Sequence, residues 1–338
     1  MGEAYVSKEQ ARIIQPNSAI LVGCFVLYKR RGSARADNQG DLLEEPGLRH
    51  QRIAGDGVDL HAVAAGKGPP VILLHGFPEN WRSWRRQIPA LTSAGFSVLV
   101  PDLRGYNLSG RPAEQNGYRL DHLVADVVAL VHATGHRRAH IVGHDWGGVI
   151  AWAFASQYPQ LVDKLVILNA PHLKIYLKKV RYPPQMLRSW YVLFFLLPRL
   201  PELVLSARDY LAIRYMFKLG PAGKAAFSDL DINEYIQALS QPGALTAALD
   251  YYRANLKMGV LRTFARVARI DLETLVIWGE LDPALGTELL EGLNEVVPRI
   301  RIHRIPRSSH WVQNEAPLEV NRALVRFLIG ENIRNHAF

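Results

Sequence analysis

Apolar segments of strand length alternate with segments of helical periodicity through the first half of the chain, and this order limits the fold more than any other feature. The run PPVILLHG (69–76) is continuously apolar, as expected of a strand covered on both faces. Helical spacing of apolar residues follows it. These are the expected segments of this order: helix 80–92, strand 96–102, helix 120–134, strand 139–144, helix 147–157 and strand 164–171. Repetition of this order predicts an α/β fold with a mostly parallel, doubly wound sheet.

Two segments depart from the alternation. HQRIAGDGVDLHAVAAG (50–66) predicts an antiparallel hairpin that turns at Asp56-Gly57. After Pro171 about a hundred residues are rich in aromatic residues and have helical spacing. The segments LETLVIWGE (272–280) and RIRIHRIP (299–306) then predict two further strands of the sheet, and the segment 312–329 predicts a final helix.

This pattern predicts three parts: an N-terminal extension (1–47), an α/β core (48–170 and 271–338), and a helical cap inserted after the sixth strand (171–270). Open α/β sheets bind ligands beyond the carboxyl ends of their strands. We therefore expect the functional site between the core and the cap.

Composition places the chain among ordinary globular proteins, with 338 residues and 49% hydrophobic content. A single cysteine, Cys24, rules out an intramolecular disulfide and offers no metal cluster, which fits a cytoplasmic protein. The apolar run SAILVGCFVLY (18–28) is far shorter than the roughly 20 residues that span a bilayer. Its basic cluster follows the apolar part, unlike a secretory signal, so peripheral attachment to a membrane is the alternative that stays open.

The net charge of +9 is concentrated in one segment. Residues 171–270 hold 15 Lys and Arg against 6 Asp and Glu, so the rest of the chain is balanced. A solvated basic face is the simpler interpretation, and attraction of anionic substrates or lipid surfaces is the other. No pattern of cations with stacking aromatic residues indicates nucleic-acid binding.

VGHDWGGVIAWAFA (142–155) contains the most specific motif. Its Gly143-His144-Asp145-Trp146-Gly147 has the spacing of the G-x-S-x-G nucleophile elbow, a strained turn between a strand and a helix, with aspartate in place of serine. Asp145 is therefore a candidate nucleophile. An aspartate at this position could instead cap the helix that follows.

A nucleophile of this kind needs a base and an acid that orients the base, each at a strand end, in the order nucleophile, acid, histidine. Asp282 follows LVIWGE and His310 follows RIRIHRIPRSS, so both fit. The rival acids are worse placed, because Asp271 precedes its strand and Glu280 lies closer to the strand body. Asn169, at another strand end, is an amide and carries no charge.

Donors for a developing oxyanion are expected in LLHGFPENW. His75, Gly76 and Pro78 surround Phe77, and Gly76 is expected to allow the loop conformation that directs the Phe77 N–H into the site. The N–H of Trp146, directly after the candidate nucleophile, would be the second donor.

Five stretches together resemble the successive motifs of epoxide hydrolases of the α/β-hydrolase fold: HGFPENWRSWRRQ, PDLRGYNLSGRP, GHDWGGVIAW, LVIWGELD and SSHWVQNEAP. The similarity covers roughly residues 48–332. It implies a small, mainly apolar epoxide as substrate, a vicinal diol as product, and neither metal nor organic cofactor. It also implies two cap tyrosines that activate the epoxide oxygen, which match Tyr191 in SWYVLFFLLPRLPE and Tyr252 in QPGALTAALDYYRAN.

Several alternatives stay open at this point. Tyr251 rivals Tyr252, and the two lie about 100° apart on a helix, so that one of them faces the site. A haloalkane or haloacid dehalogenase would share the aspartate elbow and the triad. Haloalkane dehalogenases usually carry a polar residue at the position of Phe77, and haloacid dehalogenases carry an arginine at the position of Trp146. A serine esterase lacks its serine here, and a non-catalytic binding protein would not need the complete triad. The sequence does not decide between a monomer and a homodimer.

Overall fold

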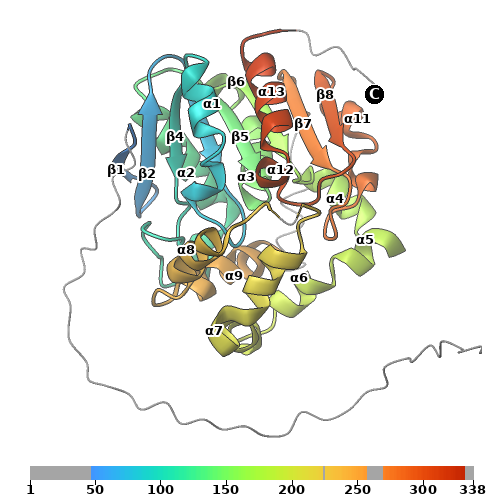
Figure 1. The fold of residues 1–338 in the computed structure, drawn as a ribbon. Helices are drawn as coiled ribbons and strands as arrows, with labels where there is room; N and C mark the ends of the chain where they lie inside the picture. The colour runs from blue at the N-terminus through green and yellow to red at the C-terminus, as the bar shows by residue number, and fades with distance from the viewer. Residues whose placement is uncertain (1–46, 224, 257–268, 332–338) are drawn as a thin grey trace, which may run out of the picture. The chain divides into compact units, whose positions relative to one another are not determined.

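A computed structural model describes residues 47–223, 225–256 and 269–331 of the chain (Figure 1). Its centre is one sheet of eight strands in the order β1-β2-β4-β3-β5-β6-β7-β8. The strands are β1 (Arg49–Ala54), β2 (Asp59–Gly66), β3 (Pro70–Leu74), β4 (Ser97–Pro101), β5 (Ala139–His144), β6 (Val162–Leu168), β7 (Thr274–Gly279) and β8 (Ile300–Ile305). β1 and β2 form the expected hairpin, β2 runs antiparallel to β4, and all other pairs are parallel. The prediction of a mostly parallel sheet is confirmed.

Helices cover both faces of this sheet, which explains the continuously apolar strands. In β3, Val71 and Leu73 pack into the cluster formed with α1 (Ile88–Ser93) and α13 (Pro317–Leu328). Ile72 and Leu74 point the other way, into the cluster formed with α2 (Leu120–Ala133) and α3 (Trp146–Gln157). Successive side chains of a strand alternate between faces, so each face of β3 needs apolar residues.

Two helices expected from periodicity are each divided in the structure. The segment 80–92 forms a 3₁₀ turn (Trp81–Trp84) and then α1, and the segment 312–329 forms α12 (Val312–Glu315) and then α13. Pro89 and Pro317 lie in the first turns of the second helices. Proline has no N–H to continue a preceding helix and disfavours a helical conformation in the residue before it. A proline in each segment therefore starts a new helix.

Six helices of the described residues lie between β6 and β7, in the segment 171–270, which is called the cap segment below. They are α4 (Leu173–Lys179), α5 (Pro183–Arg188), α6 (Trp190–Phe195), α7 (Leu200–Leu219), α8 (Asp229–Leu239) and α9 (Ala244–Asn255). α7 is kinked at 207–210, where three consecutive residues have positive φ. β6 and β7 pair directly across this long insertion, with Leu165 opposite Thr274.

The remaining short elements connect the larger ones. They are the 3₁₀ turns Gln115–Tyr118, Pro159–Leu161 and Thr287–Leu290 and the helix α11 (Leu293–Val296). None of the helices within the described ranges is both long and apolar enough to cross a membrane. The apolar run 18–28 and almost all of the expected N-terminal extension lie outside the described residues.

Candidate active site

Asp145 occupies a strained turn between β5 and α3. Its φ of 50° and ψ of −121° are far from the helical and extended regions, a conformation that proteins retain mainly where the surroundings enforce it. Both glycines of the motif permit a close approach of backbones. A Cβ on Gly143 would lie 2.3 Å from the Gly147 carbonyl oxygen, and a Cβ on Gly147 would lie 2.2 Å from that of Leu74. The spacing of the motif thus has a steric cause.

The Asp145 carboxylate is not engaged in capping α3. Asp145 is the residue before the helix, but its side chain accepts no capping hydrogen bond there. Its Oδ1 instead accepts from the Phe77 backbone N–H at 2.8 Å. This is the donor expected for the oxyanion, while Trp146 begins α3 directly after Asp145. The contact favours the interpretation of Asp145 as a reacting group over the capping alternative.

Gly76 is needed for a different reason from the one expected. It is not among the residues with positive φ, so its loop does not require the freedom of glycine. A Cβ at Gly76 would lie 2.3 Å from the Cβ of Asp145 and 2.4 Å from its Oδ1. The neighbouring His75 is buried, accepts from the Leu103 N–H through Nε2 at 3.0 Å, and contacts the Gly76 carbonyl through Nδ1 at 3.0 Å.

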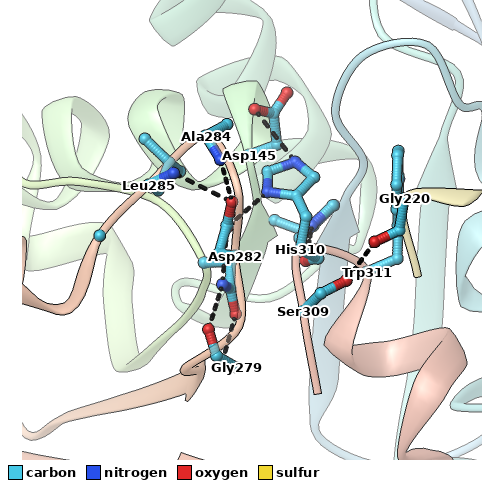
Figure 2. Close-up of polar contacts among 12 residues, drawn as sticks. Asp145, Gly220, Gly279, Asp282, Ala284, Leu285, Ser309, His310 and Trp311 are labelled. Carbon is cyan, nitrogen blue, oxygen red and sulfur yellow. Dashed lines mark hydrogen bonds and ion pairs between the residues drawn. The ribbon is translucent and has the colours of Figure 1, made fainter. Parts of the chain in front are cut away.

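His310 and Asp282 meet as expected, beside Asp145 (Figure 2). His310 Nδ1 lies 2.7 Å from Asp282 Oδ2, and His310 Nε2 lies 3.6 Å from Asp145 Oδ2. Burial by itself would lower the pKa of His310, but the carboxylates of Asp282 and then Asp145 outweigh it and raise this pKa to about 9. Burial likewise opposes the charge of Asp282, yet His310 and hydrogen bonds hold its pKa below the usual value.

Asp282 is fixed by donors on both of its oxygens. Oδ1 accepts from the backbone N–H groups of Ala284 and Leu285 at 2.8 and 2.9 Å (Figure 2). Oδ2 accepts from the Asn169 amide at 2.8 Å. The rival acids are elsewhere, because Glu280 pairs with Arg304 and Asp271 is exposed. Asn169 therefore supports the acid, a role that the sequence analysis missed although it had placed Asn169 at a strand end.

Glu315 is a second residue that sequence reasoning missed. Its carboxylate accepts from the backbone N–H of Ser309 at 3.0 Å, from the Ser309 hydroxyl at 2.7 Å and from the Trp311 N–H at 3.1 Å. The same carboxylate accepts from the N–H of Ala222 in the cap segment at 2.8 Å. Glu315 thus shapes the loop on both sides of His310. Its position five residues after His310, in a helical turn, was the one sequence feature that could have indicated this supporting role.

A buried pair lies beside His310, the candidate base. His144 is fully buried, with Nε2 2.9 Å from the His310 carbonyl oxygen and Nδ1 3.1 Å from Glu79 Oε2. Glu79 also accepts from the Ser83 hydroxyl at 2.8 Å. The His144 and His310 rings are 4.9 Å apart. This network anchors the backbone of His310 from below.

Of the two adjacent tyrosines, Tyr252 faces the candidate nucleophile. Its ring lies 5.1 Å from that of Trp146 and 6.2 Å from that of Tyr191. Tyr251 faces the core and donates its hydroxyl to the Arg104 carbonyl oxygen at 2.8 Å. Burial, and after it nearby charges that include Asp145, raise the pKa of both Tyr191 and Tyr252 well above the usual value, so both phenols keep their protons.

Two cavities share Asp145, Tyr191 and Tyr252 in their walls. The larger, of about 290 Å³, also contacts Phe77 and His310, and its rim includes side chains of α5, α6 and α7. The smaller, of about 50 Å³, is bounded by residues such as Val192 and Leu256. Within the described ranges, no group of three or more His, Cys, Asp and Glu side chains is arranged to hold a metal ion.

Known proteins resemble this chain over nearly all of the described residues. A family profile described as "alpha/beta hydrolase fold" matches residues 69–317. The AB hydrolase superfamily protein YfhM of Bacillus subtilis is 38% identical over 83% of this chain and 98% of its own length. Epoxide hydrolase 4 of Mus musculus is 36% identical over 90% of this chain and 86% of its own length.

A solved structure agrees with these sequence relatives. The epoxide hydrolase of Bacillus megaterium, crystallised with an inhibitor, superimposes with a TM-score of 0.76 at 32% identity, covering 82% of this chain and 100% of that one. The fold, the order of the motifs and these similarities all indicate the same family. The chain belongs to the alpha/beta hydrolase fold family, in its epoxide hydrolase branch.

Proposed function

We propose that the protein adds water to an apolar epoxide and releases a vicinal diol, through an ester between the substrate and Asp145. One observation carries this proposal: a carboxylate at a nucleophile elbow, with an oxyanion donor on one oxygen and two protonated phenols across the same cavity. Epoxide hydrolase activity is also what the relatives' names indicate.

In the first step, Asp145 Oδ2 attacks one epoxide carbon and the C–O bond of the ring breaks. A carboxylate, with a reference pKa near 3.9, is anionic at neutral pH and needs no base for this attack. The ring oxygen becomes an alkoxide, which takes a proton from Tyr191 or Tyr252. Their raised pKa values keep the phenols protonated until the far more basic alkoxide forms.

In the second step, His310 removes a proton from water, and the resulting hydroxide attacks the Asp145 carbonyl carbon. The oxyanion develops on Oδ1, where the Phe77 N–H already donates, with the Trp146 N–H as the second donor. Collapse of this intermediate breaks the bond to the substrate oxygen, which takes the proton from His310 and leaves as the diol. The acid that remains on Asp145 then loses its proton to His310, which restores the carboxylate and the protonated imidazole. Asp282 holds the imidazole so that Nε2 faces the ester.

The pKa of His310 couples the two steps. In the resting site the Asp145 charge helps to raise this pKa to about 9, so the imidazole holds a proton. Formation of the ester removes the Asp145 charge and therefore lowers the pKa of His310. The histidine then gives up its proton, which restores the phenol that became a phenolate in the first step, and it becomes the base that the second step requires.

The test is a single turnover of an aryl epoxide in ¹⁸O-water with enzyme in excess, followed by peptide mass analysis. In the ester mechanism the label enters the Asp145 carboxylate, because water attacks that carbonyl and the diol receives an unlabelled enzyme oxygen. Diol formed without label in the peptide containing Asp145 would contradict the proposal.

A matched variant strengthens this experiment. His310→Gln is expected to react once and to retain the ester, so the peptide containing Asp145 gains the mass of the epoxide. Asp145→Asn serves as the control that should gain none. Release of halide from haloalkanes, measured in parallel, would instead support the dehalogenase alternative, and binding without any turnover would support the non-catalytic one.

A further inference from the structure

The cap segment carries an unusual concentration of exposed apolar side chains. Among the described residues, fifteen large apolar side chains are exposed, and eleven of them fall within 182–219. They include Leu187, Trp190, Leu193 and Leu219, which are 69%, 66%, 71% and 75% exposed. Single exposed leucines are normal on a protein surface, but their concentration in one segment indicates an interaction site.

The exposed side chains belong to the consecutive helices α5, α6 and α7 and their connections. In Figure 1 these helices form the yellow-green to olive part of the ribbon, below the strands of the sheet. The exposed surface of this segment (residues 182–219) is called the cap face below. The larger cavity borders the same helices, since Trp190, Tyr191 and Phe195 of α6 line it.

The backbone that carries the cap face is firmly held. Arg253 of α9 donates to the carbonyl oxygens of Phe195 and Leu197 at 3.1 and 2.8 Å. It also binds both carboxylate oxygens of Glu202 in α7, at 2.6 and 2.8 Å. These contacts of Arg253 fix the connection between α6 and α7. The leucines beside this connection are therefore exposed because of the way the backbone is held.

The same segment is strongly basic. Residues 171–220 contain nine Lys and Arg against two Asp and Glu. Arg181, Arg199 and Arg208 are exposed, and across the described part of the chain none of them lies within ion-pairing distance of a carboxylate. Apolar side chains flanked by free cations match the chemistry of an anionic lipid surface, where acyl chains and phosphate head groups lie a few ångströms apart.

We propose that the cap face docks the protein on membranes that contain anionic lipids. A second copy of the chain is the main rival occupant, but two cap faces would bring like charges together, which is unfavourable. Trp190 suits the lipid boundary, since indole prefers the interface between acyl chains and head groups.

Docking would bring the substrate cavity to the membrane. Arg188, Trp190 and Met216, on the three helices of the cap face, also line the larger cavity. Apolar epoxides concentrate in lipid, so a cavity that opens beside a docked face could receive them from the bilayer. This consequence rests on the proposed function, whereas docking itself does not.

The experiment measures partition of the full chain into vesicles of phosphatidylcholine alone and of phosphatidylcholine with phosphatidylglycerol, at low and high salt. We expect binding to the anionic vesicles, weakened by salt. The triple variant Arg181→Glu, Arg199→Glu and Arg208→Glu, and the triple variant Leu187→Ser, Leu193→Ser and Leu219→Ser, should each bind at least about tenfold more weakly.

Matched controls lie outside the cap face. Leu318 in α13 is 82% exposed and Arg307 is exposed, so Leu318→Ser and Arg307→Glu make the same chemical changes elsewhere and should bind as the unaltered protein does. None of the residues changed in the two triple variants and these controls lines either substrate cavity, and thermal melting verifies that every variant folds. Because the readout is binding, failure of docking and failure of the epoxide reaction can be told apart.

Fluorescence gives an independent readout. The chain has seven tryptophans, and the six other than Trp190 are at most 5% exposed. Lipids that carry a quencher near the head group should therefore quench Trp190 selectively when vesicles are added, and Trp190→Phe should abolish the effect.

Three outcomes would overturn the proposal. The first is absence of binding to anionic vesicles. The second is undiminished binding by both triple variants, which would assign docking to another segment. The third is a dimer, detected by sedimentation without lipid, in which Trp190 is shielded from acrylamide, since a second copy would then cover the cap face.

Discussion

Asn169 donates an amide hydrogen to the carboxylate of Asp282, with 2.8 Å between Asn169 Nδ2 and Asp282 Oδ2. The same Asn169 also binds the end of β7, because its Oδ1 accepts from the Gly279 N–H at 2.8 Å. The amide thus joins the strand end that precedes the cap segment to the strand end that carries the acid. The Asn169 amide gives Asp282 Oδ2 a second hydrogen-bond donor besides His310.

Replacement of Asn169 by aspartate should impair the second step. The new carboxylate would face Asp282 in a buried site, and this repulsion would raise the pKa of Asp282 and weaken its hold on His310. We expect ester hydrolysis to slow by about tenfold to a hundredfold. Rapid-quench kinetics would then show accumulation of the ester while its formation is little changed. An unchanged hydrolysis rate in a folded variant would contradict the role assigned to Asn169.

Adjacent tyrosines provide a matched pair of variants. Tyr252→Phe removes a proton donor from the cavity and should slow ester formation by about a hundredfold. Tyr251→Phe removes the hydrogen bond to the Arg104 carbonyl oxygen and should cost about 1 kcal/mol of stability with little change in rate. Single-turnover rates and urea denaturation measure the two effects. The reverse result would show that the catalytic tyrosine is Tyr251.

The free energy of unfolding should depend on pH through His310. Its pKa of about 9 in the folded protein exceeds the value of 6.5 expected in the unfolded chain. A pKa raised by folding stabilises the protein fully below 6.5, and this contribution is lost as the pH rises through 9. The stability advantage of the unaltered protein over His310→Gln should therefore shrink across that window in denaturation experiments. A constant difference would mean that His310 is not protonated in the resting site.

Glu315 should act through the loop that presents His310. In Glu315→Gln an amide NH₂ replaces one acceptor oxygen and faces the N–H donors of Ser309 or Trp311, at a cost of about 1–3 kcal/mol. We expect kcat to fall while KM changes little, because the misplaced group serves hydrolysis. Glu319→Gln is the control, since Glu319 forms a partly exposed pair with His303 outside the site. Equal effects of the two variants on kcat would exclude a positioning role.

Substrate preference should follow the unequal cavities. A cavity of about 150 Å³ holds a benzene ring, so a ring fits the larger space of about 290 Å³ but not the smaller one of about 50 Å³. Epoxides with one aryl substituent should therefore have a much higher kcat/KM than those with an aryl group on each carbon. Val192→Ala, which enlarges the smaller cavity, should reduce that difference. Equal kcat/KM values for styrene oxide and trans-stilbene oxide would contradict this expectation.

The sequence predicted the sheet and the approximate site because both depend on local pattern. Strand-end positions in the sequence place Asp145, Asp282 and His310 at one edge of the expected sheet, and the structure brings these three side chains together. Helix boundaries were less accurate where Pro89 and Pro317 outweighed the apolar periodicity.

The rest depends on contacts between distant segments. Asn169 and Glu315 became recognisable as supporting residues only when β7 and the His310 loop were placed beside them. Gly76 illustrates the same limit: the need for glycine was foreseen, but its cause is the side chain of Asp145, 69 residues away in the sequence. The family resemblance favoured Tyr252 over Tyr251, and the packing of α9 shows that Tyr252 borders the cavity while Tyr251 bonds to the core.

The pairing of β6 with β7 across the cap segment has a consequence for synthesis of the chain. Asp145 and its elbow leave the ribosome well before the strands that carry Asp282 and His310, and roughly a hundred residues separate the two partner strands. Until β7 is translated, the outer edge of β6 has no partner for its backbone groups, and such an edge can pair with another chain. The nascent protein therefore passes through a stage in which its nucleophile is made, its base and acid are not, and its sheet is open to aggregation.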